Sequence, residues 1–128
     1  MEVFGANRVV IVPRGIGSRP PWRLTAGRIS DARCFGALVT LEPTGLVLVR
    51  PGRTFSLADL FRTWGQRLSR RLVARFVAGP GQEVRVYVNG RRRPGSPGVI
   101  SLRRHSEVVL EVGPYVPPHP VYTFPPGT

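Results

Sequence analysis

The residues best suited to bind a charged ligand are arginines on either side of an Asn-Gly dipeptide. Arginine recognises phosphates and carboxylates through its planar guanidinium group. A surface that combines arginines with an aromatic ring is what a single-stranded nucleic acid requires. We therefore predict anion or nucleic-acid contacts here, with a solvated basic turn as the alternative interpretation. The candidate residues are Arg91, Arg92, Arg93, Arg103, Arg104, Arg85 and Tyr87.

One cysteine and two histidines are the candidates for nucleophilic or metal chemistry. The single cysteine, Cys34, excludes an internal disulfide and a cysteine-rich zinc site. Only Glu107, two residues after His105, lies at a useful spacing from a histidine. Cys34 and His105 can act as a nucleophile and its base, or as two ligands of one metal ion, only if the fold brings them close together. We expect no catalytic residues, no metal and no cofactor, and we keep a metalloprotein or enzyme that uses this pair as a weaker alternative.

Charge and composition restrict the class of protein. The chain has 128 residues, which suits one domain, and a net charge of +12 in which every basic residue is arginine. A basic chain attracts polyanions, so a nucleic acid or a protein partner is possible. No apolar run is long enough for a membrane span. Residues 1–12 lack the pattern of a signal peptide, so none is expected and the localisation stays open.

One helix is predicted with well-defined ends, over residues 57–64. Ser56 is a good N-cap, Asp59 completes a capping box, and Gly65 suits the position after the last turn. The apolar residues recur with helical spacing and define one buried face: Leu57, Leu60, Phe61 and Trp64. We expect Phe61 and Trp64 to be core residues and not a ligand platform.

Alternating and turn-flanked segments predict short strands elsewhere. We expect an N-terminal hairpin over residues 3–12, strands over 37–41 and 46–50, and a strand over 84–88 that ends at Asn89-Gly90. The segment 18–26 contains Pro20 and Pro21 and is interpreted as loop or edge material. The segment 66–77 fits a helix or a strand, and the turn at residues 79–81 favours a strand.

This order of elements predicts an α+β fold, a β-grasp-like mixed sheet packed on one main helix, with an N-terminal β-hairpin and a Pro-rich C-terminal tail. Residues 1–113 form the domain in this interpretation. Residues 114–128 form a tail that docks on it through its apolar and aromatic side chains, Tyr115, Val121, Tyr122 and Phe124.

Residues 12–124 resemble a family of uncharacterised small bacterial proteins, many of which are exported. The resemblance rests on landmarks spread over most of the chain, chiefly Pro13-Arg14-Gly15-Ile16-Gly17, Thr54-Phe55-Ser56-Leu57 with Phe61 and Trp64-Gly65, Val88-Asn89-Gly90 and Gly113-Pro114-Tyr115. This resemblance implies possible export, while the order of elements is the basis for the ubiquitin-like scaffold.

The chain departs from this family at its histidines. Members often carry Leu-His-Thr-His-Asp after the cysteine, where this chain has Leu38-Val39-Thr40-Leu41-Glu42, and an upstream His-rich strand is absent at residues 2–10. No metal site is therefore carried over. The order of elements also resembles sulphur-carrier β-grasp proteins, but the Gly-Gly end of those proteins is missing. We expect a non-catalytic binding or structural module, with nucleic-acid binding as the alternative.

Overall fold

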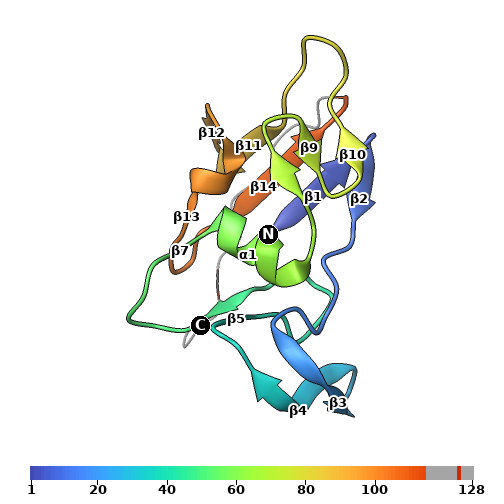
Figure 1. The fold of residues 1–128 in the computed structure, drawn as a ribbon, viewed down its shortest axis with the longest axis vertical. Helices are drawn as coiled ribbons and strands as arrows, with labels where there is room; N and C mark the ends of the chain where they lie inside the picture. Colours follow the sequence, from blue (N-terminus) through green and yellow to red (C-terminus); the bar gives the residue numbers. More distant parts are fainter. Residues whose placement is uncertain (115–123, 125–128) are drawn as a thin grey trace.

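Five strands form the central sheet of the structure, a computed structural model that describes residues 1–114 and residue 124 (Figure 1). The strands are β1 (Glu2–Gly5), β2 (Arg8–Val10), β11 (Arg85–Val88), β12 (Arg91–Arg93) and β14 (Val108–Val112). Their order is β12-β11-β14-β1-β2, in which β1 and β14 run parallel and all other neighbours run antiparallel. The fold is therefore α+β with a mixed sheet, as the sequence predicts.

The predicted N-terminal hairpin and the predicted turn at Asn89-Gly90 are confirmed, and the second turn also joins a hairpin, β11–β12. Ala6 and Asn7 turn the chain between β1 and β2 with positive φ, and Asn89 and Gly90 do the same between β11 and β12. Two consecutive positive φ values match the right-handed twist of the flanking strands. The N-terminal hairpin is part of the central sheet, since β1 lies between β14 and β2.

Helix α1 (Leu57–Trp64) has the predicted bounds and caps. The Ser56 hydroxyl accepts a hydrogen bond from the Asp59 N–H, the Asp59 carboxylate accepts one from the Ser56 N–H, and Gly65 takes the left-handed conformation at φ 80°. The helix covers one face of the sheet with side chains that are at most 1 % exposed, Leu57, Leu60 and Phe61. They share a core with residues from three sheet strands, Val3, Val86 and Leu110.

Short strands precede and follow α1 in the chain and pair outside the central sheet. β7 (Phe55–Ser56) pairs with β13 (Ser101–Leu102), and the 3-10 helix η1 (Pro97–Val99) lies beside α1. Residues 66–77 are extended, as favoured from the sequence, but as three strands instead of one. These are β8 (Leu68–Ser69), β9 (Leu72–Val73) and β10 (Phe76–Val77), separated by tight turns.

A further hairpin lies on the opposite side of α1 from the central sheet (Figure 1). It consists of β3 (Ser18–Thr25) and β4 (Arg28–Phe35), so the prediction that residues 18–26 are loop or edge material is only partly right. The pairing of β3 with β4 shifts register between Arg19 and Trp22, at Pro20 and Pro21, because proline has no N–H to donate to the opposite strand. Between this hairpin and α1, β5 (Leu38–Val39) pairs with β6 (Leu48–Val49), as predicted but shorter.

The predicted docking of the Pro-rich tail falls mostly on residues outside the described part of the chain. Phe124 is described, and its ring stacks on that of His105 with centroids 4.9 Å apart and planes 8° from parallel.

Candidate functional site

The predicted arginine-rich turn is an edge strand. Arg91, Arg92 and Arg93 make up β12, the outermost strand on that side of the sheet, and all three are exposed. Arg103 and Arg104 are exposed in the turn that follows β13. Val88 of β11 lies opposite Arg91 on one side and opposite Val108, the first residue of β14, on the other. The start of β12 and the segment that leads into β14 therefore lie at the same end of the sheet.

The expectation that Tyr87 and Arg85 face outward beside these arginines is wrong. Tyr87 is only 7 % exposed. The Arg85 guanidinium donates hydrogen bonds to the carbonyls of Gly113 (2.7 Å) and Pro114 (3.1 Å), and its Nε lies 3.4 Å from a carboxylate oxygen of the buried Glu111. Both residues belong to β11, which has a strand on each side, and its successive residues Val86 and Tyr87 are both buried. The surface around β12 therefore presents arginines without Tyr87.

Cys34 and His105 lie in different environments. Cys34 is exposed on β4 and lines a cleft, whereas His105 is exposed in the turn before β14, is not among the lining residues, and stacks on Phe124. Among residues 1–114 and 124, His, Cys, Asp and Glu side chains do not gather in groups of three or more that would hold a metal.

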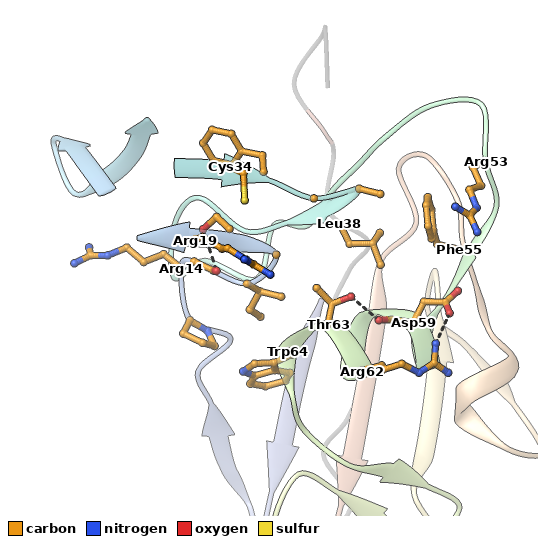
Figure 2. Close-up of a pocket in the computed structure, with 18 of the residues that line it drawn as sticks. Arg14, Arg19, Cys34, Leu38, Arg53, Phe55, Asp59, Arg62, Thr63 and Trp64 are labelled. Atoms are coloured by element: carbon orange, nitrogen blue, oxygen red, sulfur yellow. Dashed lines mark hydrogen bonds and ion pairs between the residues drawn. The ribbon is translucent and has the colours of Figure 1, made fainter. Parts of the chain in front are cut away.

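The cleft that contains Cys34 has a volume of about 870 Å³ (Figure 2). One wall is built by residues 13–19 with the β3–β4 hairpin, and the other by residues 53–55 with α1; Leu38 lies between them. Arginines stand on both walls, and so do aromatic rings. The arginines are Arg14, Arg19, Arg53 and Arg62, and the aromatic residues are Trp22, Phe35, Phe55 and Trp64.

A buried threonine fixes the loop that carries Arg14. The Thr40 hydroxyl donates to the Pro13 carbonyl (2.7 Å) and accepts from the Ile16 N–H (3.1 Å), and Thr40 is fully buried. Its backbone adds two bonds, from the Gly15 N–H to the Thr40 carbonyl (2.8 Å) and from the Thr40 N–H to the Ile16 carbonyl (3.1 Å). The loop is therefore held by four hydrogen bonds to one residue of the β5 segment.

Glycine is required at two places in the same wall. Gly17 has φ +73°, and a Cβ there would collide with the Leu38 carbonyl. A Cβ on Gly15, which has φ +95°, would lie 2.5 Å from the Trp22 ring. The ring can approach the loop closely only because Gly15 has no side chain.

The opposite wall contains one carboxylate, and it is already engaged. Asp59 accepts from the Ser56 N–H (2.8 Å) and pairs with Arg62 Nη1 at 3.1 Å. These interactions, the Ser56 N–H first, lower the pKa of Asp59 below its usual value, so it is ionised at neutral pH. Arg53 lies over the Phe55 ring at 5.5 Å, and Arg14 donates to the Gly27 carbonyl (3.0 Å).

The cleft consequently carries a positive charge. Its lining has four arginines and one carboxylate. Within the described part of the chain, no carboxylate forms an ion pair with Arg14, Arg19 or Arg53.

The aromatic residues of the cleft differ in exposure. Trp22 and Phe35, both on the β3–β4 hairpin, are 39 % and 41 % exposed. Trp64 is half-buried and its ring contacts that of Phe61, with centroids 5.3 Å apart. Phe61 is a core residue as predicted, while Trp64 lies at the margin of the core and also lines the cleft. This site was not predicted from the sequence, although Pro13-Arg14-Gly15-Ile16-Gly17 in its wall was already a landmark of the family resemblance.

Comparison with known protein families, with curated proteins and with solved structures finds no match for this chain. The resemblance to exported bacterial proteins therefore stays a prediction from the sequence. No helix in the described residues has the length and apolar character needed to cross a membrane.

Proposed function

We propose that this protein is a non-catalytic binding module of the β-grasp type that binds an anionic ligand in the arginine-lined cleft. The β-grasp assignment is supported by the parallel pairing of β1 with β14, the first and last strands of the described residues, at the centre of the sheet, by a hairpin on each side, and by a helix that shares its core with the sheet. The observation that carries the function is the presence of four arginines on two facing walls with a single, already paired carboxylate.

This arrangement favours an anion for electrostatic and geometric reasons. Charge-assisted hydrogen bonds from arginine to phosphate or carboxylate are about twice as strong as neutral ones. A ligand between the walls can contact Arg19 on one side and Arg53 and Arg62 on the other, while the Arg14 side chain is turned away toward the Gly27 carbonyl (Figure 2). The volume of about 870 Å³ is in the range of sites for small molecules or for part of a polymer.

The composition of the lining supports binding without turnover. Cys34 is the only thiol of the chain, and the lining contains no histidine that would act as its base. Asp59, the one carboxylate in the lining, is ionised and already accepts a hydrogen bond that caps the helix.

A pair of double variants with equal change in net charge tests the location of the site. Arg19→Gln with Arg53→Gln removes two charges from the cleft, and Arg91→Gln with Arg93→Gln removes two from β12. With short polyphosphate as the probe, fluorescence titration should show weaker binding for the first variant and nearly wild-type binding for the second. Equal effects of the two variants would overturn the proposal.

The exposed arginines of β12 favour a second candidate, non-specific contact with a polyanion. All three are exposed, and Arg103 and Arg104 lie near the same end of the sheet. In that case the β12 variant, and not the cleft variant, weakens binding and flattens its dependence on salt.

A further inference from the structure

The cleft combines its arginines with rings that the core does not use. Trp22 and Phe35 are about two-fifths exposed and lie outside the hydrophobic core. A site for a simple inorganic anion needs only the charged groups, so these rings indicate a ligand with flat faces of its own. Nucleobases are such a ligand, because every base offers a π-face for stacking.

We propose that the cleft binds single-stranded nucleic acid, with phosphates on the arginines and bases stacked on Trp22 and Phe35. This inference rests on the proposed function and specifies its ligand. Proteins that bind single strands without strict sequence preference combine a positive groove with aromatic side chains in this way. A duplex does not fit the arrangement, because its bases are already stacked on one another and cannot reach the rings.

A polymer is favoured over a mononucleotide by the distribution of charge. The chain has 19 arginines and 7 acidic residues, and only four of those arginines line the cleft. A nucleic-acid strand that continues beyond the cleft gains additional electrostatic attraction from the basic surface outside it. A mononucleotide is too short to reach that surface. For single strands, the logarithm of the binding constant falls with the logarithm of salt by about 0.7 for each neutralised phosphate.

The cleft contains residues whose fluorescence and reactivity would report on a bound ligand. Trp22 and Trp64, the only two tryptophans, both line the cleft, and so does Cys34, the only cysteine. A strand stacked in the cleft should quench tryptophan fluorescence and protect Cys34 from alkylation. Contact at β12 alone should do neither, because β12 residues are not part of the lining.

The test uses the full chain and a fluorescent single-stranded oligonucleotide of about ten nucleotides, within the usual site sizes. Loss of one stacking contact, about 1–3 kcal/mol, corresponds to about a 5- to 140-fold loss of affinity, which we expect for Phe35→Leu and for Trp22→Leu. Phe35→Tyr keeps a ring and should bind as the wild type does. Arg19→Gln should flatten the salt slope by about 0.7, and Arg92→Gln should change neither affinity nor Cys34 protection.

The outcomes separate the two proposals. If polyphosphate binds as tightly as the oligonucleotide and Phe35→Leu leaves both unchanged, the cleft is an anion site and the nucleic-acid inference is overturned. If neither polymer protects Cys34 and Arg19→Gln has no effect, the proposed function fails as well. Duplex of the same length binding equally well, with equal quenching, would also overturn the inference.

Discussion

Replacing Thr40 by valine should destabilise the protein, because it removes the side-chain half of the clamp on the Pro13–Ile16 loop. Valine keeps the branched shape and loses the hydroxyl, which makes two hydrogen bonds in a fully buried position. Each such bond contributes about 0.5–1.5 kcal/mol, and a buried N–H left without a partner costs about 1–3 kcal/mol. We expect the free energy of unfolding to fall by about 2–4 kcal/mol, a large part of the roughly 5–15 kcal/mol typical of a domain.

Urea unfolding followed by tryptophan fluorescence measures this change, because the Trp22 ring packs against Gly15 of the clamped loop and Trp64 lines the same cleft. Hydrogen exchange at the Ile16 amide should accelerate in the same variant, since that amide donates to the Thr40 hydroxyl. Thr40→Ser keeps the hydroxyl and loses one methyl group, so it should cost only about 1 kcal/mol. Thr63→Val, on the exposed face of α1, should stay within about 0.5 kcal/mol of wild type. If Thr40→Val were no less stable than Thr40→Ser, the two hydrogen bonds would not hold the loop, and the reasoning would be wrong.

Three further perturbations probe the glycine in the cleft wall, the buried ion pair and the helix cap. Gly17→Ala should lower the free energy of unfolding by more than the roughly 1–2 kcal/mol of a left-handed residue, because its Cβ also meets the Leu38 carbonyl; urea unfolding measures this. Arg85→Met should cost about 3–5 kcal/mol by the same assay, because it removes the guanidinium that pairs with the buried Glu111. Asp59 has a lowered pKa when folded, so its contribution to stability is present above its ordinary pKa of about 4 and lost as the pH falls through the lowered one. Asp59→Asn should flatten the acid limb of stability measured from about pH 6 to about pH 2, through the range where carboxylates titrate.

Each of these predictions has a matched control. Gly27 has φ +80° and no atom within 4 Å of the place that a Cβ would occupy, so Gly27→Ala isolates the conformational cost. Arg92→Met on the exposed edge strand should change stability by less than about 0.5 kcal/mol. Glu83→Gln, in an exposed segment, should leave the acid limb as it is in the wild type. Equal losses in a test variant and its control would contradict the corresponding explanation.

Features fixed by neighbouring residues could be predicted from the sequence. The ends of α1 depend on Ser56, Asp59 and Gly65, all in contact with the helix itself, and both bounds are correct. The Asn89-Gly90 turn is equally local. The alternation from Val84 to Val88 identified a strand, but alternation does not tell whether the second face is covered. That depends on residues distant in the sequence, and for this reason Tyr87 was expected at the surface and is buried.

The cleft could not be predicted because its charged residues come from distant parts of the chain. Arg14 precedes β3 and Arg19 belongs to it, whereas Arg53 precedes α1 and Arg62 lies in the last turn of that helix. The β3–β4 hairpin was also obscured, since two adjacent prolines argue against a strand unless a register shift accommodates them. Only the folded arrangement places these arginines opposite one another.

The parallel pairing of β1 with β14 bears on the order in which the protein folds during synthesis. Glu2 lies opposite Val109. Strand β1, which the ribosome makes first, can therefore pair with β14 only after nearly the whole described chain has been synthesised. Until β14 emerges, β1–β2 and β11–β12 are separate hairpins, because β14 is the strand that lies between them. Contacts between such distant residues slow folding. A nascent chain stalled before Val108 would therefore expose both inner sheet edges, those of β1 and β11, as templates for incorrect pairing.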